Sequence, residues 1–167
     1  MTDLKTLLSD RISGKTAKTL AKTRSGEELF DLLFNNDKRI SDNAAWVMTH
    51  LPKTADAFLN GRRDTLINEA MHTTSPSKRR LIMNLLERTS FTHEQIRTDF
   101  LDFCLNTIVS NEPIGIRSLA IKLAYAQCVH YPELHTEFDN TLKMMDTTAL
   151  PPALKHIRGK MLERRLR

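Results

Sequence analysis

The sequence contains little glycine, proline, cysteine or aromatic side chain. Its 167 residues include five Gly, six Pro and two Cys, and 6% are aromatic. Long alternating runs of β-branched residues are also missing, so the sequence gives no support for β-strands. Most of the Gly and Pro stand where helices would begin or end, which is typical of an all-α protein.

Long apolar runs are missing too. No stretch approaches the roughly 18 consecutive apolar residues of a membrane span, and the segment Met1–Lys5 lacks the basic and apolar regions of a secretory signal. Cys104 and Cys128 lie in apolar helical stretches without metal-ligand spacing. This predicts buried, reduced thiols and a soluble, cytoplasmic protein with no membrane partner.

The net charge of +5 is unevenly distributed. Residues 1–25 carry six Lys or Arg against two acidic residues, residues 26–149 carry thirteen against seventeen, and residues 150–167 carry six against one. The chain therefore has two basic ends on a mildly acidic body. Such a distribution is a weak indication of nucleic-acid binding.

Motifs that carry chemistry are missing. Gly14, Lys15 and Thr16 resemble the end of a P-loop, but Ser9 stands where that motif needs Gly. The six His include no pair four residues apart, so no zinc site is predicted, and there is no Gly-x-Ser-x-Gly nucleophile motif. We therefore predict no catalytic, cofactor-binding or metal-ligating residues, no cofactor and no enzymatic activity.

Apolar residues recur with a period of 38 residues. Two adjacent columns are apolar in all four copies, and a third is apolar in three copies before it ends at Arg158. The three columns are Val47, Leu85, Leu123 and Met161; Met48, Leu86, Ala124 and Leu162; and Ala44, Ile82, Ala120 and Arg158. Such a period is typical of stacked helical hairpins, each too small to bury its own apolar face.

The same register divides the chain into helical pairs within a single domain, residues 1–167. A capping box is expected at Ser25 with Glu28. Pro76 is expected at the first position of a helix capped by Ser75. Another helix, Thr92–Val109, is expected to be capped by Thr92. The predicted elements are N-terminal capping helices within 1–24, with Asp3–Ile12 as the first, followed by pairs over 26–51, 61–88, 92–130 and 132–166.

Two stretches share one pattern, and that pattern decides which family the chain resembles. In LLFNNDKRISDNAAWVM (32–48) a helix ends in a polar Asn/Asp turn, and an Ala-rich second helix begins with a basic residue; NEPIGIRSLAIKLA (111–124) repeats this pattern. This pattern resembles a HEAT repeat. The resemblance covers residues 26–166 and implies a right-handed α/α superhelix of about four hairpins, with each second helix on the concave side. It implies no reaction. Ile82 and the Arg158–Gly159 pair depart from the pattern, so the last pair is interpreted as a C-terminal cap.

Beside the apolar columns lies a more polar set of positions on the second helices. Residues spaced i, i+3 and i+4 share a helix face, so these positions should form one strip on the concave side. The twelve positions of this strip are Asp42, Trp46, Thr49, Arg80, Asn84, Glu87, Ser118, Lys122, Tyr125, His156, Lys160 and Glu163. The partner-binding residues predicted from it are Trp46, Arg80, Asn84, Lys122, Tyr125 and Lys160.

Trp46, the single tryptophan, has two interpretations. It is either an exposed anchor for a partner or a residue covered by the N-terminal capping helices. The basic groups also have two. Lys78, Arg79 and Arg80 lie in a first helical turn, where the macrodipole disfavours cations, so they form either a solvated face or contacts with an acidic partner, within the protein or outside it. Arg164, Arg165 and Arg167 suit a helix C-terminus without any ligand.

These patterns favour a non-enzymatic protein-interaction module that binds a protein or peptide on its concave surface. The alternative is a nucleic-acid-binding protein similar to the HEAT-like DNA glycosylases, which bind duplex in such a groove. Glu87 and Glu163 interrupt the basic residues of the strip, whereas a phosphate backbone favours a continuous positive stripe. Trp46 and Asp42 alone are too few to form a base-flipping site.

Overall fold

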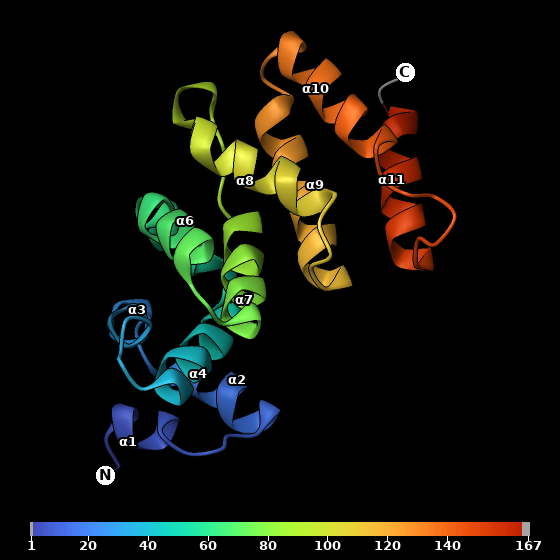
Figure 1. The fold of residues 1–167 in the computed structure, drawn as a ribbon. Coiled ribbons are helices and arrows are strands. Elements are labelled where there is room, and N and C mark those ends of the chain that lie inside the picture. Colours follow the sequence, from blue (N-terminus) through green and yellow to red (C-terminus); the bar gives the residue numbers. More distant parts are fainter. Residues whose placement is uncertain (1, 165–167) are drawn as a thin grey trace. The chain divides into compact units, whose positions relative to one another are not determined.

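A computed structural model describes residues 2–164 of the protein. Within them every regular element is helical and no strand occurs, so the all-α prediction is confirmed (Figure 1). The chain forms two compact units, the first ending at Thr89 and the second beginning at Ser90. None of the helices in the described part combines the length and apolar character needed to cross a membrane.

The first unit contains two packed helical pairs and an N-terminal addition. Helix α3 pairs with α4, α6 pairs with α7, and α4 and α7 pack against each other, while α1 and α2 lie against α4 (Figure 1). The elements are α1 (Leu4–Leu8), α2 (Gly14–Thr23), α3 (Gly26–Leu32), α4 (Lys38–Thr49), η1 (Lys53–Ala55), α5 (Asp56–Gly61), α6 (Arg63–His72) and α7 (Pro76–Glu87).

Side-chain caps set the starts of these helices. Ser25 and Glu28 form the predicted reciprocal capping box at α3, and Ser75 accepts a hydrogen bond from the backbone N–H of Lys78, with Pro76 at the first position of α7. At α4 the carboxylate of Asp37 accepts from two backbone N–H groups. Each cap satisfies donors that the helix itself leaves unpaired.

The first predicted helix, Asp3–Ile12, is shorter than expected. It ends at Leu8, because the amide of Asn43 in α4 donates to the carbonyl oxygens of Leu8 and Asp10, at 2.9 and 3.0 Å. A side chain more than thirty residues away thus supplies donors to carbonyl oxygens that backbone N–H groups would bind if the helix continued. Ile12 lies in the connection between α1 and α2.

The second unit also contains two helical pairs. Helix α8 packs on α9, α9 contacts both α10 and α11, and α10 and α11 contact each other. Its elements are η2 (His93–Gln95), α8 (Thr98–Ile108), α9 (Ile114–Cys128), α10 (Pro132–Lys143) and α11 (Pro152–Arg164).

The predicted continuous helix Thr92–Val109 is wrong at its start. The backbone N–H of Thr92 donates to the side chain of Gln95, at 3.2 Å, and this cap closes a single 3-10 turn. Ile96 is then extended, and α8 begins only at Thr98. Thr92 and Gln95 form their hydrogen bonds with each other within this turn, so the cap does not mark the start of α8.

The three apolar columns are buried in the first three pairs and belong to the core, as predicted. Val47 and Leu85 are 0% exposed and Leu123 is 1% exposed, each on the second helix of its pair. In the last copy Arg158 is half-buried, and its Nε donates to the carbonyl oxygen of Leu142 at 2.8 Å. A basic residue can occupy this position because its stem packs inward while its head caps the end of α10.

Candidate interaction surface

The first unit holds three of the six predicted partner-binding residues. Trp46 lies on α4, and Arg80 and Asn84 lie on α7, the helix that packs against α4. Arg80 is exposed, while Trp46 and Asn84 are half-buried. The structure therefore brings them onto two adjacent helices with their side chains at least partly accessible.

Trp46 fits neither of its two interpretations completely. Its side chain borders a hollow of about 370 Å³, together with Arg39 and Asn43 of α4 and with Arg11 and Ile12 of the α1–α2 connection. The N-terminal segment thus reaches the tryptophan, as the covering interpretation requires. The indole nevertheless remains half-buried rather than enclosed.

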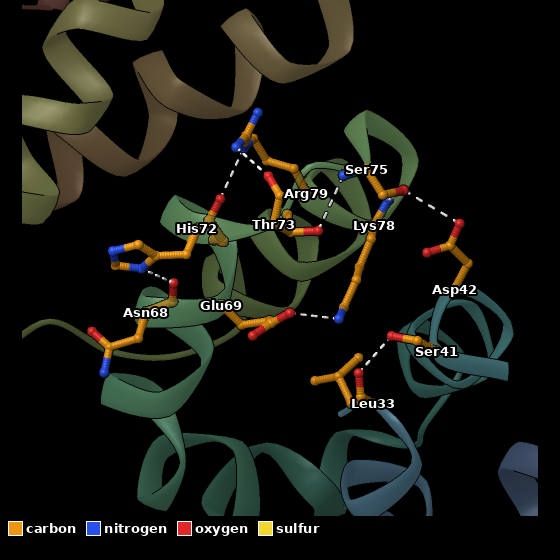
Figure 2. Close-up of polar contacts among 11 residues, drawn as sticks. Leu33, Ser41, Asp42, Asn68, Glu69, His72, Thr73, Ser75, Lys78 and Arg79 are labelled. Carbon is orange, nitrogen blue, oxygen red and sulfur yellow. Dashed lines mark hydrogen bonds and ion pairs between the residues drawn. The ribbon is translucent and has the colours of Figure 1, made fainter. Parts of the chain in front are cut away.

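A polar network lies between α4, α6 and α7, and Figure 2 shows it. The hydroxyl of Ser75 donates to Oδ2 of Asp42 at 3.3 Å, and Nζ of Lys78 pairs with Oε1 of Glu69 at 2.5 Å. The guanidinium of Arg79 donates to the carbonyl oxygens of Ala70 and Thr73, at 2.8 and 2.6 Å. These bonds tie the start of α7 to both the helix before it and the helix of the preceding pair.

This network corrects the interpretation of the basic first turn as a solvated face. Lys78 is buried and meets an acidic partner within the protein, which offsets the unfavourable helix dipole. Arg79 is half-buried and caps the end of α6. Only Arg80 of the three is exposed.

Asp42 serves the same network. Its Oδ2 accepts from Lys38, at 2.8 Å, and from Ser75. Its Oδ1 is buried and has no hydrogen-bond partner among residues 2–164. A carboxylate held in this way between two helices joins the two pairs, and the unsatisfied oxygen costs some of that stabilisation.

The second unit holds the other three predicted residues. Lys122 and Tyr125 lie on α9 and Lys160 lies on α11, and these helices pack together. Both lysines are exposed and Tyr125 is half-buried, with its ring centroid 6.1 Å from that of Phe138. Tyr125 also borders a hollow of about 330 Å³ lined by Val129, His135, Asp139 and Arg164.

The basic C-terminus is described in part. Arg164 is exposed and borders the hollow beside Tyr125, while Arg165 and Arg167 lie outside the described residues. The continuity of the strip from the first unit to the second stays a prediction.

Sequence reasoning missed the residues around the two aromatic side chains. Arg39 and Asn43 precede Trp46 by seven and three residues, so helical periodicity could have placed them on its face. Arg11 and Ile12 had no such signal, because they come from a separate segment that a long-range hydrogen bond brings to α4.

The titratable groups with shifted pKa values are not members of the strip. Burial raises the pKa of the Cys104 thiol. A hydrogen bond from Arg97 lowers the pKa of Asp99, and hydrogen bonds from Thr148 lower the pKa of Asp146. Across residues 2–164, no three His, Cys, Asp or Glu lie together in a way that could hold a metal ion.

Paired helices with equivalent core positions define an α-helical repeat protein. The model of the HEAT repeat domain matches residues 4–165, and the chain belongs to this family. HEAT repeats generally mediate protein–protein interactions, and the family is typically non-enzymatic. Comparisons with curated proteins and with solved structures give no match.

Proposed function

We propose that the protein is a non-enzymatic interaction module that binds a protein or peptide along the strip. In this proposal about four helical pairs stack in a right-handed superhelix, and the second helices α4, α7, α9 and α11 line its concave side. One observation carries the proposal. All twelve strip positions are half-buried or exposed, whereas the neighbouring columns through Val47 and Met48 are buried in the first three pairs.

The composition of the strip also favours a protein partner. Trp, Tyr and Arg dominate the energetics of protein interfaces, because they combine a large contact area with a polar group. Trp46 and Tyr125 are half-buried on second helices, and Arg80 is exposed on another. Because the rings of Trp46 and Tyr125 are already half-buried, ordering them on binding costs less side-chain entropy than ordering fully exposed side chains.

Affinity capture with the full chain tests the proposal. Partners retained by the wild type are identified, and their binding to the variants Arg80→Glu and Tyr125→Ala is then measured. The matched control is Lys53→Glu, which makes the same change of charge at another exposed site of the first unit, on η1. We expect the strip variants to lose the partner while Lys53→Glu retains it. Equal retention by all three variants would overturn the proposal.

Nucleic-acid binding is the second candidate, because residues 1–25 carry six basic residues against two acidic ones. The exposed Glu87 and Glu163 of the strip oppose a phosphate backbone. Fluorescence anisotropy with a labelled duplex at low and moderate salt separates the candidates. A phosphate-backbone ligand loses affinity steeply as salt rises, whereas an aromatic-anchored peptide is affected little.

A further inference from the structure

The hollow beside Trp46 is assembled from two segments that are distant in the chain. Arg11 and Ile12 come from the α1–α2 connection, and Arg39, Asn43 and Trp46 come from α4. The Asn43 amide donates to the carbonyl oxygens of Leu8, at the end of α1, and of Asp10, in the connection, and so holds the segments together. The hollow has a volume of about 370 Å³, which lies within the range of sites for small ligands.

Two cationic side chains border this hollow without an internal counter-ion. Among residues 2–164, no group accepts a hydrogen bond from the guanidinium of Arg11 or of Arg39, and none forms an ion pair with either of them. The acidic residues that most closely precede them in the sequence have other hydrogen-bond partners. Asp10 accepts from the backbone N–H of Arg11 at 2.7 Å, and Asp37 caps α4. The guanidinium groups therefore remain available to an external anion.

Two apolar side chains also line the hollow, beside the amide of Asn43. Ile12 and Trp46 are both half-buried, so each presents part of an apolar surface beside the guanidinium groups. A ligand that matches this arrangement carries an anionic group next to an apolar one. An acidic side chain adjacent to a leucine-like side chain in a peptide has this chemistry.

We propose that the hollow binds a carboxylate side chain, with its apolar neighbour, in an acidic segment of a protein partner. This inference rests on the proposed function and names the chemistry of the partner at one end of the strip. A guanidinium presents a planar set of donors that matches the two oxygens of a carboxylate. The indole of Trp46 and the side chain of Ile12 would cover the neighbouring apolar group.

A nucleic acid is a less suitable occupant. A phosphate chain leaving the hollow along the strip would pass Asp42 on α4 and Glu87 on α7. The exposed Glu87 repels phosphate, whereas the charge of Asp42 is offset by its ion pair with Lys38, and backbone tracking needs many basic contacts in succession. A peptide places charge only at chosen side chains and so avoids this repulsion.

The single tryptophan allows a direct test on the full chain. The emission of Trp46 is followed while the peptide Ser-Glu-Leu-Glu-Ser is added, and the peptide Ser-Gln-Leu-Gln-Ser provides the uncharged comparison. We expect the Glu peptide to change the emission and to bind at least about tenfold more tightly than the Gln peptide, since hydrogen bonds to charged groups are the stronger ones. No change with the Glu peptide at millimolar concentration, or equal affinity for both peptides, would overturn the proposal.

Variants locate the binding. Arg39→Gln and Arg11→Gln should each weaken binding of the Glu peptide about tenfold. Lys38→Gln is the matched control, because Lys38 is next to Arg39 but its ammonium is bonded to Asp42. Tighter, steeply salt-dependent binding of a single-stranded oligonucleotide, lost in the same arginine variants, would assign the hollow to nucleic acid instead.

The outcomes also separate this inference from the proposed function. If the Glu peptide does not bind but Arg80→Glu and Tyr125→Ala still lose the captured partner, the strip functions and only the hollow is wrongly assigned. If the strip variants retain every partner, the proposed function fails, whatever the peptide does at Trp46.

Discussion

The hydroxyl of Ser75 donates a hydrogen bond to Oδ2 of Asp42 at 3.3 Å and also accepts one from the backbone N–H of Lys78 at 3.2 Å. One side chain therefore caps α7 and joins it to α4 of the preceding pair (Figure 2). The same hydroxyl therefore takes part in the start of α7 and in one hydrogen bond between the two packed pairs.

Replacing this hydroxyl should destabilise the first unit. Ser75→Ala removes a helix cap and one of the bonds to Asp42, and the expected loss is about 1–2 kcal/mol of unfolding free energy. Urea denaturation of the full chain measures it. Thr74→Ala, at the exposed neighbouring position, should stay within about 0.5 kcal/mol of the wild type. Equal stabilities of the two variants would show that the cap contributes nothing.

Truncating a residue of the core columns should cause a larger loss of unfolding free energy. Leu85→Ala should lower the unfolding free energy by about 2–5 kcal/mol, because it removes buried methyl groups and leaves a cavity. Leu123→Ala should behave alike, since Leu123 occupies the equivalent position in another pair. Ser77→Ala, an exposed change on the same helix as Leu85, is the control for denaturation experiments. Losses below about 1 kcal/mol would contradict the equivalence of the columns.

Two ion pairs of the network should differ in strength. The side chain of Lys78 is 9% exposed and that of Glu69 is 25% exposed, whereas the side chain of Lys38, which pairs with Asp42, is 74% exposed. Lys78→Met leaves Glu69 with a poorly solvated charge and should cost up to about 3 kcal/mol. Lys38→Met should cost about 0–1 kcal/mol. A double-mutant cycle with Glu69→Leu tests whether the first loss reflects an uncompensated charge.

The surroundings of Trp46 predict how quenchers act on its fluorescence. Because the indole is half-buried beside Arg11 and Arg39, acrylamide should quench it partly in the native protein. Relative to their effects on free tryptophan, iodide should quench it more strongly than caesium, since the guanidinium groups attract the anion. Arg39→Gln should reduce this preference, and Lys53→Glu on η1 should leave it unchanged. Equal quenching by both ions in the wild type would contradict the described hollow.

Alkaline pH should destabilise the second unit through Cys104. Burial raises the pKa of this thiol in the folded state, so the unfolded chain loses its proton first. The stabilisation is complete below the unfolded pKa of about 8.5 and decreases as the pH rises above it. Denaturation at pH 7 and pH 10, with Cys104→Ala as the comparison, measures the effect. A thiol reagent should react slowly with Cys104 in the native protein, because the reactive thiolate is suppressed.

Local patterns in the sequence determined the helices and their core. The recurrence of Val47, Leu85 and Leu123 places each on the buried face of a second helix, because helical periodicity acts within one element. The Ser25–Glu28 cap is likewise formed by residues three positions apart. Even so, the similar cap at Thr92 closes only a 3-10 turn, since a local cap does not specify how far the following helix extends.

Only the tertiary structure decided what surrounds the side chains of the candidate surface. Lys78 pairs with Glu69 of another helix, and Trp46 borders Arg11 and Ile12, which precede it by more than thirty residues. No periodicity within a helix encodes these neighbours, since they depend on how separate elements pack. The partners and exposure of a residue on the strip follow from contacts between helices, whereas its position on the helix follows from the order of residues in the chain.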